Sequence, residues 1–274
     1  MFRNLNEDQL SEKANKLRAD ILKMLCEAGS GHTGGALSSI DIVTVLYNKI
    51  MNIDPKNPTW DKRDRFVLSK GHGCVALYAV LADCGYFPEE ELKTLRKYGS
   101  ILQGHPYMHK TPGFDVSAGS LGQGLSVAVG MALAARMDGK DNRVYCLMGD
   151  GENQEGQIWE AAMAAGHYKL DNLCGILDNN GLQIDGKVED VMNIEPIADK
   201  WKAFNWNIVE INGHDVKEIE KAFMAAAEYK GKPTLILAHT VKGKGVSFME
   251  NVSSWHGAAP NKEQLETALN ELGF

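Results

Sequence analysis

Apolar residues recur along the chain at two spacings, one typical of helices and one typical of buried strands. Between Asp8 and Glu27 they recur every three or four residues, which predicts an amphipathic helix. Short runs rich in β-branched and other apolar residues predict strands at Arg65 to Ser69, Arg143 to Met148, Leu173 to Leu177, Trp206 to Ile211 and Thr234 to Ala238. Further helices are predicted at Ser39 to Ile50, Val75 to Ala82, 88 to 98, Leu125 to Arg136, Asn153 to His167, Val216 to Tyr229 and Asn261 to Leu272.

This alternation of strands and helices predicts the fold class. It favours an α/β fold with a doubly wound, mainly parallel sheet and helices on both faces, in which ligands bind at the carboxyl ends of the strands. The 274 residues contain no internal repeat, low-complexity tract or linker. We therefore expect residues 1–274 to form a single domain.

Composition narrows the class of protein. A net charge of −7 without a long basic run argues against nucleic-acid binding. The five cysteines form no CxxC pair, and Cys74, Cys146 and Cys174 lie in apolar runs, as expected for reduced, buried thiols. The amino terminus has no apolar signal core, and no run is long enough to span a bilayer. These features predict a cytoplasmic protein that is neither secreted nor inserted into a membrane.

Two predicted strand ends carry the chemistry around which the chain is organised. One strand ends on Gly149-Asp150-Gly151, and the next ends on Asp178-Asn179-Asn180-Gly181. Neighbouring strands would bring Asp150 and Asn180 together, with a nearby backbone carbonyl for which Leu182 is a candidate. This hard, oxygen-rich set suits magnesium, which keeps its other positions for water or phosphates. The alternative is two ordinary turns, because Gly, Asp and Asn are common turn residues.

Several loops carry histidines or lysines beside glycines. His32 lies in the glycine-rich run from Gly29 to Gly35, and His72 follows Lys70 at a strand end. Read alone, each of these is equally or more simply explained as a turn residue. The same holds for Lys242 and Lys244, which follow the last strand. A further glycine turn, from 119 to 124, opens into a helix, which is a favourable place for an anion.

Seven motifs together resemble transketolase, and they cover nearly the whole chain in that family's order. They are SGHTGGALS (30–38), SKGHG (69–73), QGHP (103–106), GSLGQGLSVAVGMA (119–132), GDGENQEGQIWEA (149–161), DNNGLQIDG (178–186) and WHGAAP (255–260). The 27 residues from 152 to 178 also match the spacing of the GDG-to-NN signature of thiamine diphosphate enzymes. The chain is similar to the N-terminal, diphosphate-binding domain of that family.

The resemblance implies a cofactor site. Asp150, Asn180 and the carbonyl of Leu182 would hold Mg²⁺ or Ca²⁺. The residues that would contact thiamine diphosphate are His72, Gly119, Ser120, Leu121, Gly151, Asn180 and His256. Glu155, which we group with this set, matches a family glutamate that reaches across the subunit interface toward the partner's cofactor-activating glutamate.

The resemblance also implies an activity. His32, His105 and His256 would be the histidines of the substrate pocket, transferring protons while a two-carbon ketol unit moves from a ketose phosphate to an aldose phosphate in the pentose phosphate pathway. Thr33 departs from the family, which usually has proline there, and we expect this to loosen the loop that carries His32.

The chain ends at Phe274, so the family's pyrimidine-binding domain and C-terminal domain are expected on another chain. We predict the N-terminal subunit of a split transketolase, active only with a C-terminal subunit in an α2β2 or dimeric assembly; a truncated longer enzyme would look the same. Alternatives are a ketol transferase for unusual sugars, the α-like half of a 2-oxo acid dehydrogenase, which should lack the loop histidines, and a non-catalytic cofactor-binding partner.

Overall fold

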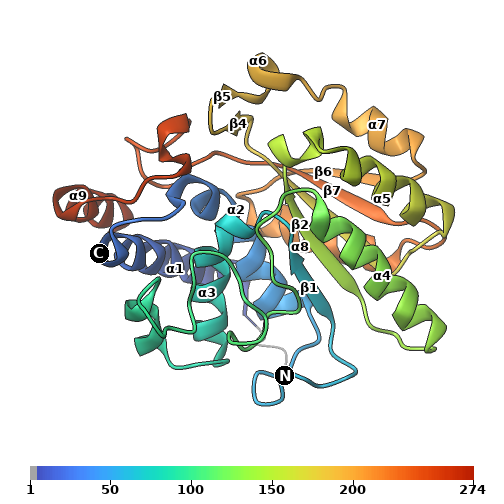
Figure 1. Ribbon diagram of the computed structural model, residues 1–274, viewed down its shortest axis with the longest axis horizontal. Coiled ribbons are helices and arrows are strands. Elements are labelled where there is room, and N and C mark those ends of the chain that lie inside the picture. Colours follow the sequence, from blue (N-terminus) through green and yellow to red (C-terminus); the bar gives the residue numbers. More distant parts are fainter. Residues whose placement is uncertain (1–4) are drawn as a thin grey trace.

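The centre of the molecule is a five-stranded parallel sheet with strand order β1-β2-β3-β7-β6 (Figure 1). The computed structural model describes residues 5–274. Residues 1–4, which belong to the amino terminus where we expect no signal sequence, lie outside the described residues. The strands are β1 (Arg65–Leu68), β2 (Val144–Gly149), β3 (Leu173–Asn179), β6 (Asn207–Asn212) and β7 (Thr234–His239). The predicted α/β class with a mainly parallel sheet is confirmed.

Helices cover both faces of this sheet, as expected (Figure 1). One layer contains α1 (Glu7–Ala28), α2 (Thr33–Val45), α3 (Cys74–Cys84) and α8 (Val216–Glu228), and the other contains α4 (Gln123–Met137), α5 (Gly156–His167) and α7 (Ile197–Ala203). The remaining elements are β4 (Leu182–Gln183), β5 (Gly186–Lys187), α6 (Val188–Met192), α9 (Lys262–Leu272), a π-helical turn (Leu46–Ile50) and short 3₁₀ turns at Gly71–Gly73, Glu89–Thr94, Gly151–Gln154 and Ser253–His256.

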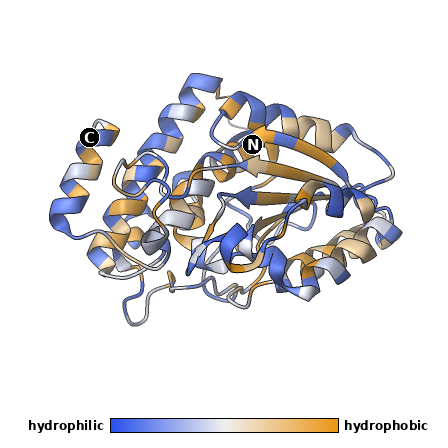
Figure 2. Ribbon diagram, turned by 90° about the horizontal axis from the view of Figure 1, so that it is seen from above, coloured by the Kyte–Doolittle hydropathy of each residue, from blue (hydrophilic) through white to orange (hydrophobic). Residues whose placement is uncertain are grey.

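Strand β2 shows why these residues form a central strand. Tyr145 and Leu147 pack toward the layer of α1, α2 and α3, whereas Cys146 and Met148 pack toward α4 and α5. Because side chains alternate between the two faces of a strand, a run that is apolar at every position is buried on both. The orange strands lie between the helical layers in Figure 2. The predicted burial of Cys74, Cys146 and Cys174 is confirmed.

The parallel register brings the carboxyl ends of β2, β3 and β7 together. Gly149 pairs with Asp178, and Asn179 pairs with His239, so the loops after β2, β3 and β7 leave the sheet at one edge. This confirms that β2 and β3 are neighbours whose ends bring Asp150 and Asn180 together. The β4–β5 hairpin follows directly at the same edge (Figure 1).

The sequence misplaced several element boundaries. The second helix begins at Thr33 rather than Ser39, because Thr33 to Gly35 form its first turn, and its last predicted turn is π-helical. The predicted helix at 88 to 98 is a 3₁₀ turn at Glu89–Thr94. Weak local preference was overridden by packing in both places. In the described part of the chain no helix is long and apolar enough to cross a membrane.

The helix predicted from Asn153 also starts late, at Gly156, after a 3₁₀ turn. Glu152 belongs to that 3₁₀ turn and precedes the helix. Its buried carboxylate accepts hydrogen bonds from the backbone N–H groups of Gly122 (2.8 Å) and Gly149 (3.0 Å) and from the hydroxyl of Ser69. The anion-binding turn expected at 119 to 124 thus receives a carboxylate of the protein itself.

Candidate active site

A cavity of about 220 Å³ opens at the carboxyl ends of β2, β3 and β7. Its lining contains eight of the residues that the sequence singled out for cofactor, metal or catalysis: His72, Leu121, Asp150, Gly151, Glu155, Asn180, Leu182 and His256. Lys70, Asp178 and Lys242 also line it. We call this cavity the strand-end pocket.

Asp150 presents an oriented carboxylate to this pocket. It is buried, and its two oxygens accept hydrogen bonds from the N–H groups of Gly151 (2.7 Å) and Gly181 (2.5 Å). Burial, followed by the nearby charge of Asp178, raises the pKa of Asp150 to about 6. Among residues 5–274 no cationic side chain forms an ion pair with this carboxylate, so its hydrogen bonds come from backbone N–H groups, and the charge of Lys242 acts on it from a greater distance.

The other two oxygens of the expected metal set lie beside it. The side-chain oxygen of Asn180 accepts a hydrogen bond from the N–H of Leu182 (3.1 Å), while its amide nitrogen donates to Asp178 (3.3 Å). The carbonyl of Leu182 accepts a hydrogen bond from the ammonium of Lys242 (2.9 Å), so it already faces a cation. Within the described residues no cluster of three or more His, Cys, Asp or Glu side chains is placed to hold a metal. The expected set of one carboxylate, one amide and one carbonyl thus lies together at this pocket, and these oxygens suit a hard cation such as Mg²⁺.

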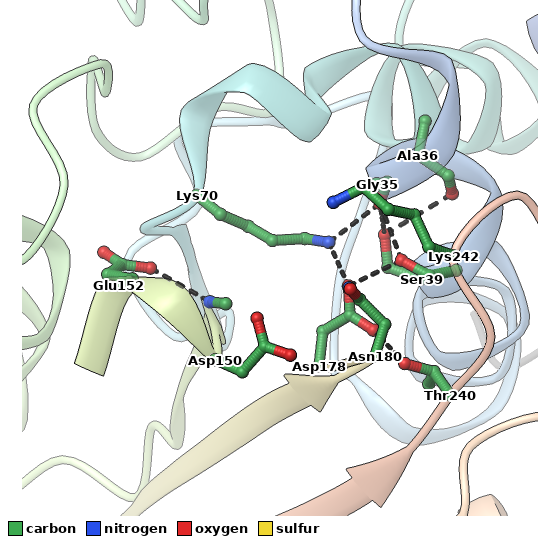
Figure 3. Close-up of polar contacts among 12 residues, drawn as sticks. Gly35, Ala36, Ser39, Lys70, Asp150, Glu152, Asp178, Asn180, Thr240 and Lys242 are labelled. Carbon is green, nitrogen blue, oxygen red and sulfur yellow. Dashed lines mark hydrogen bonds and ion pairs between the residues drawn. The ribbon is translucent and has the colours of Figure 1, made fainter. Parts of the chain in front are cut away.

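Two buried lysines, whose role the sequence left open, form the cationic wall of the pocket. Lys70 reaches across to the carboxylate of Asp178 and donates to the carbonyl of Gly35 (2.8 Å), as Figure 3 shows. The hydroxyls of Ser38 and Thr240 also donate to Asp178. Burial alone would raise the pKa of Asp178, but Lys70 and these hydroxyls together hold it below its ordinary value.

Lys242 differs from Lys70 because among the described residues it contacts no carboxylate. Its ammonium donates to the carbonyl of Leu182 and lies 3.1 Å from Nδ1 of His256. Burial and the charge of Lys70 lower its pKa to about 8, so it remains mostly protonated at neutral pH. Two adjacent cations of this kind suit a multiply charged anion.

Four histidines converge above the pocket. The ring centroid of His32 lies 5.3 Å from that of His72, 5.8 Å from that of His105 and 5.7 Å from that of His256, and His72 and His256 are 4.9 Å apart. The three loop histidines predicted as catalytic therefore gather in one place, although His32 and His105 lie outside the pocket lining. His32 Nδ1 is buried and has no hydrogen-bond partner among the described residues.

These histidines are neutral at physiological pH. Burial, followed by neighbouring positive charges, lowers the pKa of His32 and of His256 to about 4 and lowers those of His72 and His105. These pKa values are low because four imidazoles and two lysines share one poorly solvated region. Protonated Lys242 only donates, so Nδ1 of His256 accepts and its Nε2 carries the proton.

The glycine turn from 119 to 124 contributes one residue, Leu121, to the pocket lining. Leu121 is exposed at the pocket, and Ser120 is exposed in the turn before it. Gly119 lies beside His105, since a Cβ atom on Gly119 would be 3.7 Å from that ring. Glu155 is exposed at the pocket rim and directly precedes α5.

Comparison with known proteins identifies the arrangement. Residues 9–274 match the family model described as transketolase, thiamine diphosphate binding domain. The chain belongs to the transketolase family. It is 47% identical over 265 residues to a protein of Phocaeicola vulgatus named as one subunit of apulose-4-phosphate transketolase, over 97% of this chain and 94% of that protein. It is also 48% identical over 263 residues to 6-deoxy-6-sulfo-D-fructose transketolase subunit SqwG of a Clostridium species, over 96% of each.

A solved transketolase gives the same fold. The crystal structure of transketolase from Campylobacter jejuni superposes with a TM-score of 0.93 and 39% identity, over 98% of this chain and 43% of that one. The chain thus spans less than half of that transketolase and nearly all of the two subunits named above. The predicted transketolase thiamine diphosphate-binding chain is confirmed, and a ketol-transferring enzyme that depends on thiamine diphosphate fits both the family and the pocket.

Proposed function

We propose that this chain is the N-terminal subunit of a two-chain transketolase, which binds thiamine diphosphate through a divalent metal and needs a separate C-terminal subunit for turnover. The observation that carries the proposal is the strand-end pocket, whose lining brings Asp150 together with two buried lysines and two of the four neutral histidines. Two relatives of similar length are named as subunits, which supports a partner chain. We further propose a cytoplasmic α2β2 or dimeric assembly.

The residues present fit a metal-bound diphosphate. Asp150, Asn180 and the carbonyl of Leu182 would hold Mg²⁺ or Ca²⁺, since each is a hard oxygen donor at the pocket. Lys70, Lys242, His72 and the backbone of Gly151 would face the phosphates, and Gly119, Ser120, Leu121 and His256 would complete the contacts. When bound, thiamine diphosphate supplies the electron sink for cleaving and forming the carbon–carbon bond.

The histidines then move protons. Neutral His32, whose ring lies 5.7 Å from that of His256, accepts a proton from a sugar hydroxyl, and His256 offers its Nε2–H as a donor. His105 borders the same space and orients the sugar. Glu155, exposed at the rim, would meet the partner subunit rather than the substrate.

Two classes of sugar are candidate substrates. Ketose and aldose phosphates of the pentose phosphate pathway are our first candidates. The two relatives named for apulose 4-phosphate and for 6-deoxy-6-sulfo-D-fructose support a second candidate, a ketol transferase acting on a less common sugar.

The cofactor site is tested by calorimetric titration of the assembled complex with thiamine diphosphate, with and without Mg²⁺. We expect metal-dependent binding in the native protein and none in Asp150→Ala, because the only carboxylate of the donor set is gone. Asp185→Ala is the matched control, since Asp185 lines the pocket from the β4–β5 turn without belonging to that set. Equal affinity in native protein and Asp150→Ala would reject the site.

The catalytic assignment is tested with His256→Ala. Turnover should fall about 100-fold, as for loss of a proton-transfer group, while the free energy of unfolding changes by less than about 1 kcal/mol. Comparable losses in turnover and in stability would mean that His256 is a structural residue.

A further inference from the structure

The first turn of α2 touches three segments that carry pocket residues. The carbonyl of Gly34 accepts a hydrogen bond from the N–H of Gly243 (3.1 Å), and the carbonyl of Gly35 accepts one from Lys70. A Cβ atom on Gly34 would lie 2.8 Å from Cγ of Lys242 and 3.2 Å from the carbonyl oxygen of Trp255. Only a residue without a side chain permits this approach, so the turn is held tightly against the segments around Lys242 and His256.

Thr33 adds a side-chain bond to this contact. It is fully buried as the first residue of α2, and its hydroxyl donates a hydrogen bond of 2.6 Å to the carbonyl of Ala258. Thr33 directly follows His32, and Ala258 lies two residues after His256. A single hydrogen bond therefore joins the two segments whose histidine rings lie 5.7 Å apart.

The segment that receives this bond has little else to hold it. Among the described residues no other hydrogen bond involves residues 258–260. His256 itself is fixed on one side by Lys242, and it lies at the end of a single 3₁₀ turn. The hydroxyl of Thr33 thus restrains the far side of the His256 loop.

Thr33 stands where the family usually has proline, a change that we expect to loosen the His32 loop, and in the structure its hydroxyl adds a hydrogen bond at this point. Proline and threonine both suit the first position of a helix, but only threonine has a hydroxyl to donate. We infer that Thr33 is a positioning residue that joins the His32 and His256 segments and sets their separation for proton transfer. This inference rests on the proposed function.

Three variants test it in the assembled complex. Thr33→Val removes the hydroxyl while keeping the shape, Thr33→Pro is a second hydroxyl-free variant that suits a helix start, and Thr33→Ser keeps the donor. The rate of limited chymotryptic cleavage after Trp255, three residues before Ala258, is measured by mass spectrometry beside steady-state kinetics and thiamine diphosphate affinity.

We expect Thr33→Val and Thr33→Pro to raise the rate of this cleavage about fivefold, because losing one ordinary hydrogen bond makes local opening of the segment about that much more frequent. Their kcat should fall by a similar factor, with KM and cofactor affinity within about twofold of the native complex, and Thr33→Ser should restore both the cleavage rate and kcat. A native cleavage rate in Thr33→Val, an unchanged kcat, or a Thr33→Ser variant as impaired as Thr33→Val would overturn the inference.

The two proposals fail separately. A native complex that binds thiamine diphosphate but moves no ketol unit would refute the proposed function, while the rate of cleavage after Trp255 still reports on the Thr33 bond. A native-like cleavage rate in the hydroxyl-free variants of an active complex would refute the Thr33 bond alone.

Discussion

Two buried aspartates, Asp178 and Asp41, each form an ion pair with a buried cation. Their clusters hold the consecutive residues Thr240 and Val241, but only Asp178 borders the pocket. Asp178 pairs with Lys70 and accepts from the hydroxyl of Thr240. Asp41 pairs with Arg18 at 2.6 Å and with Nδ1 of His214 at 2.7 Å, and Nε2 of His214 accepts the N–H of Val241 (2.8 Å). We call these the Asp178 cluster (Ser38, Lys70, Asp178, Thr240) and the Asp41 cluster (Arg18, Asp41, His214).

The difference lies in what stands beside each cluster. The Asp41 cluster is bounded by helices α1 and α2 and by the loop before α8, and none of its members lines the strand-end pocket. The Asp178 cluster stands beside Lys242 and Asp150, which contact no oppositely charged side chain among the described residues. Buried charge alone therefore does not identify a binding site; buried charge that the protein leaves unmatched does.

The largest effect is expected from breaking the Asp178 cluster. Asp178→Asn leaves the buried ammonium of Lys70 without its counter-charge, so the free energy of unfolding should fall by about 3–5 kcal/mol. Cofactor binding should be lost in the protein that remains folded. Urea denaturation and calorimetric titration measure the two effects.

Asp41→Asn is the matched variant of the other cluster. It should destabilise the fold by a comparable amount but keep cofactor affinity within about threefold under conditions where both variants are folded. Equal loss of affinity in the two variants would erase the distinction between the clusters.

Lys242→Met should separate binding from stability. Cofactor affinity should fall about 10- to 100-fold, as for a lost charge-assisted hydrogen bond, whereas the fold should become equally or more stable because a buried cation without a carboxylate partner is removed. A destabilised variant with native affinity would show that Lys242 is structural.

The pH dependence follows from the sign of the shift. Because the folded protein lowers the pKa of Lys242 from 10.5 to about 8, the unfolded chain binds more protons in that window. Stability of the native protein should therefore rise between about pH 8 and 10.5 relative to Lys242→Met, which urea denaturation across this range measures.

A smaller effect distinguishes the two strand-end carboxylates. Metal binding requires ionised Asp150, whose pKa is about 6, so Mg²⁺-dependent cofactor affinity should fall about tenfold from pH 7 to pH 5. The pKa of Asp178 is lowered instead, so its stabilising contribution persists until the pH falls below its ordinary value of 3.8. Affinity should thus be lost while the fold is retained; simultaneous loss of both would contradict the assignment.

The sequence predicted the strand-end chemistry because strand ends, glycines and a fixed spacing are local features. The ends of β2 and β3 place Asp150 and Asn180 as expected, and the predicted histidines gather nearby. The sequence left the roles of Lys70 and Lys242 open, because a lysine in a glycine-rich turn is usually exposed. Only the packing of distant segments buries these two side chains.

Other features depend on contacts between distant segments. The bond from Thr33 to Ala258 joins residues 225 positions apart, so no local pattern predicts it. The early start of α2 at Thr33 was missed as well. The roles of Asp178 and Glu152 arise in the same way, from partners brought together by the sheet.

The central claim is that this chain supplies the diphosphate-binding half of a transketolase. Its most direct test is two-carbon transfer from xylulose 5-phosphate to ribose 5-phosphate with thiamine diphosphate and Mg²⁺, using the chain alone, the chain mixed with its C-terminal transketolase partner, and the same mixture with Asp150→Ala. We predict activity only in the native mixture, with apulose 4-phosphate and 6-deoxy-6-sulfo-D-fructose tried as alternative donors. Turnover by the chain alone, or undiminished turnover with Asp150→Ala, would contradict the account.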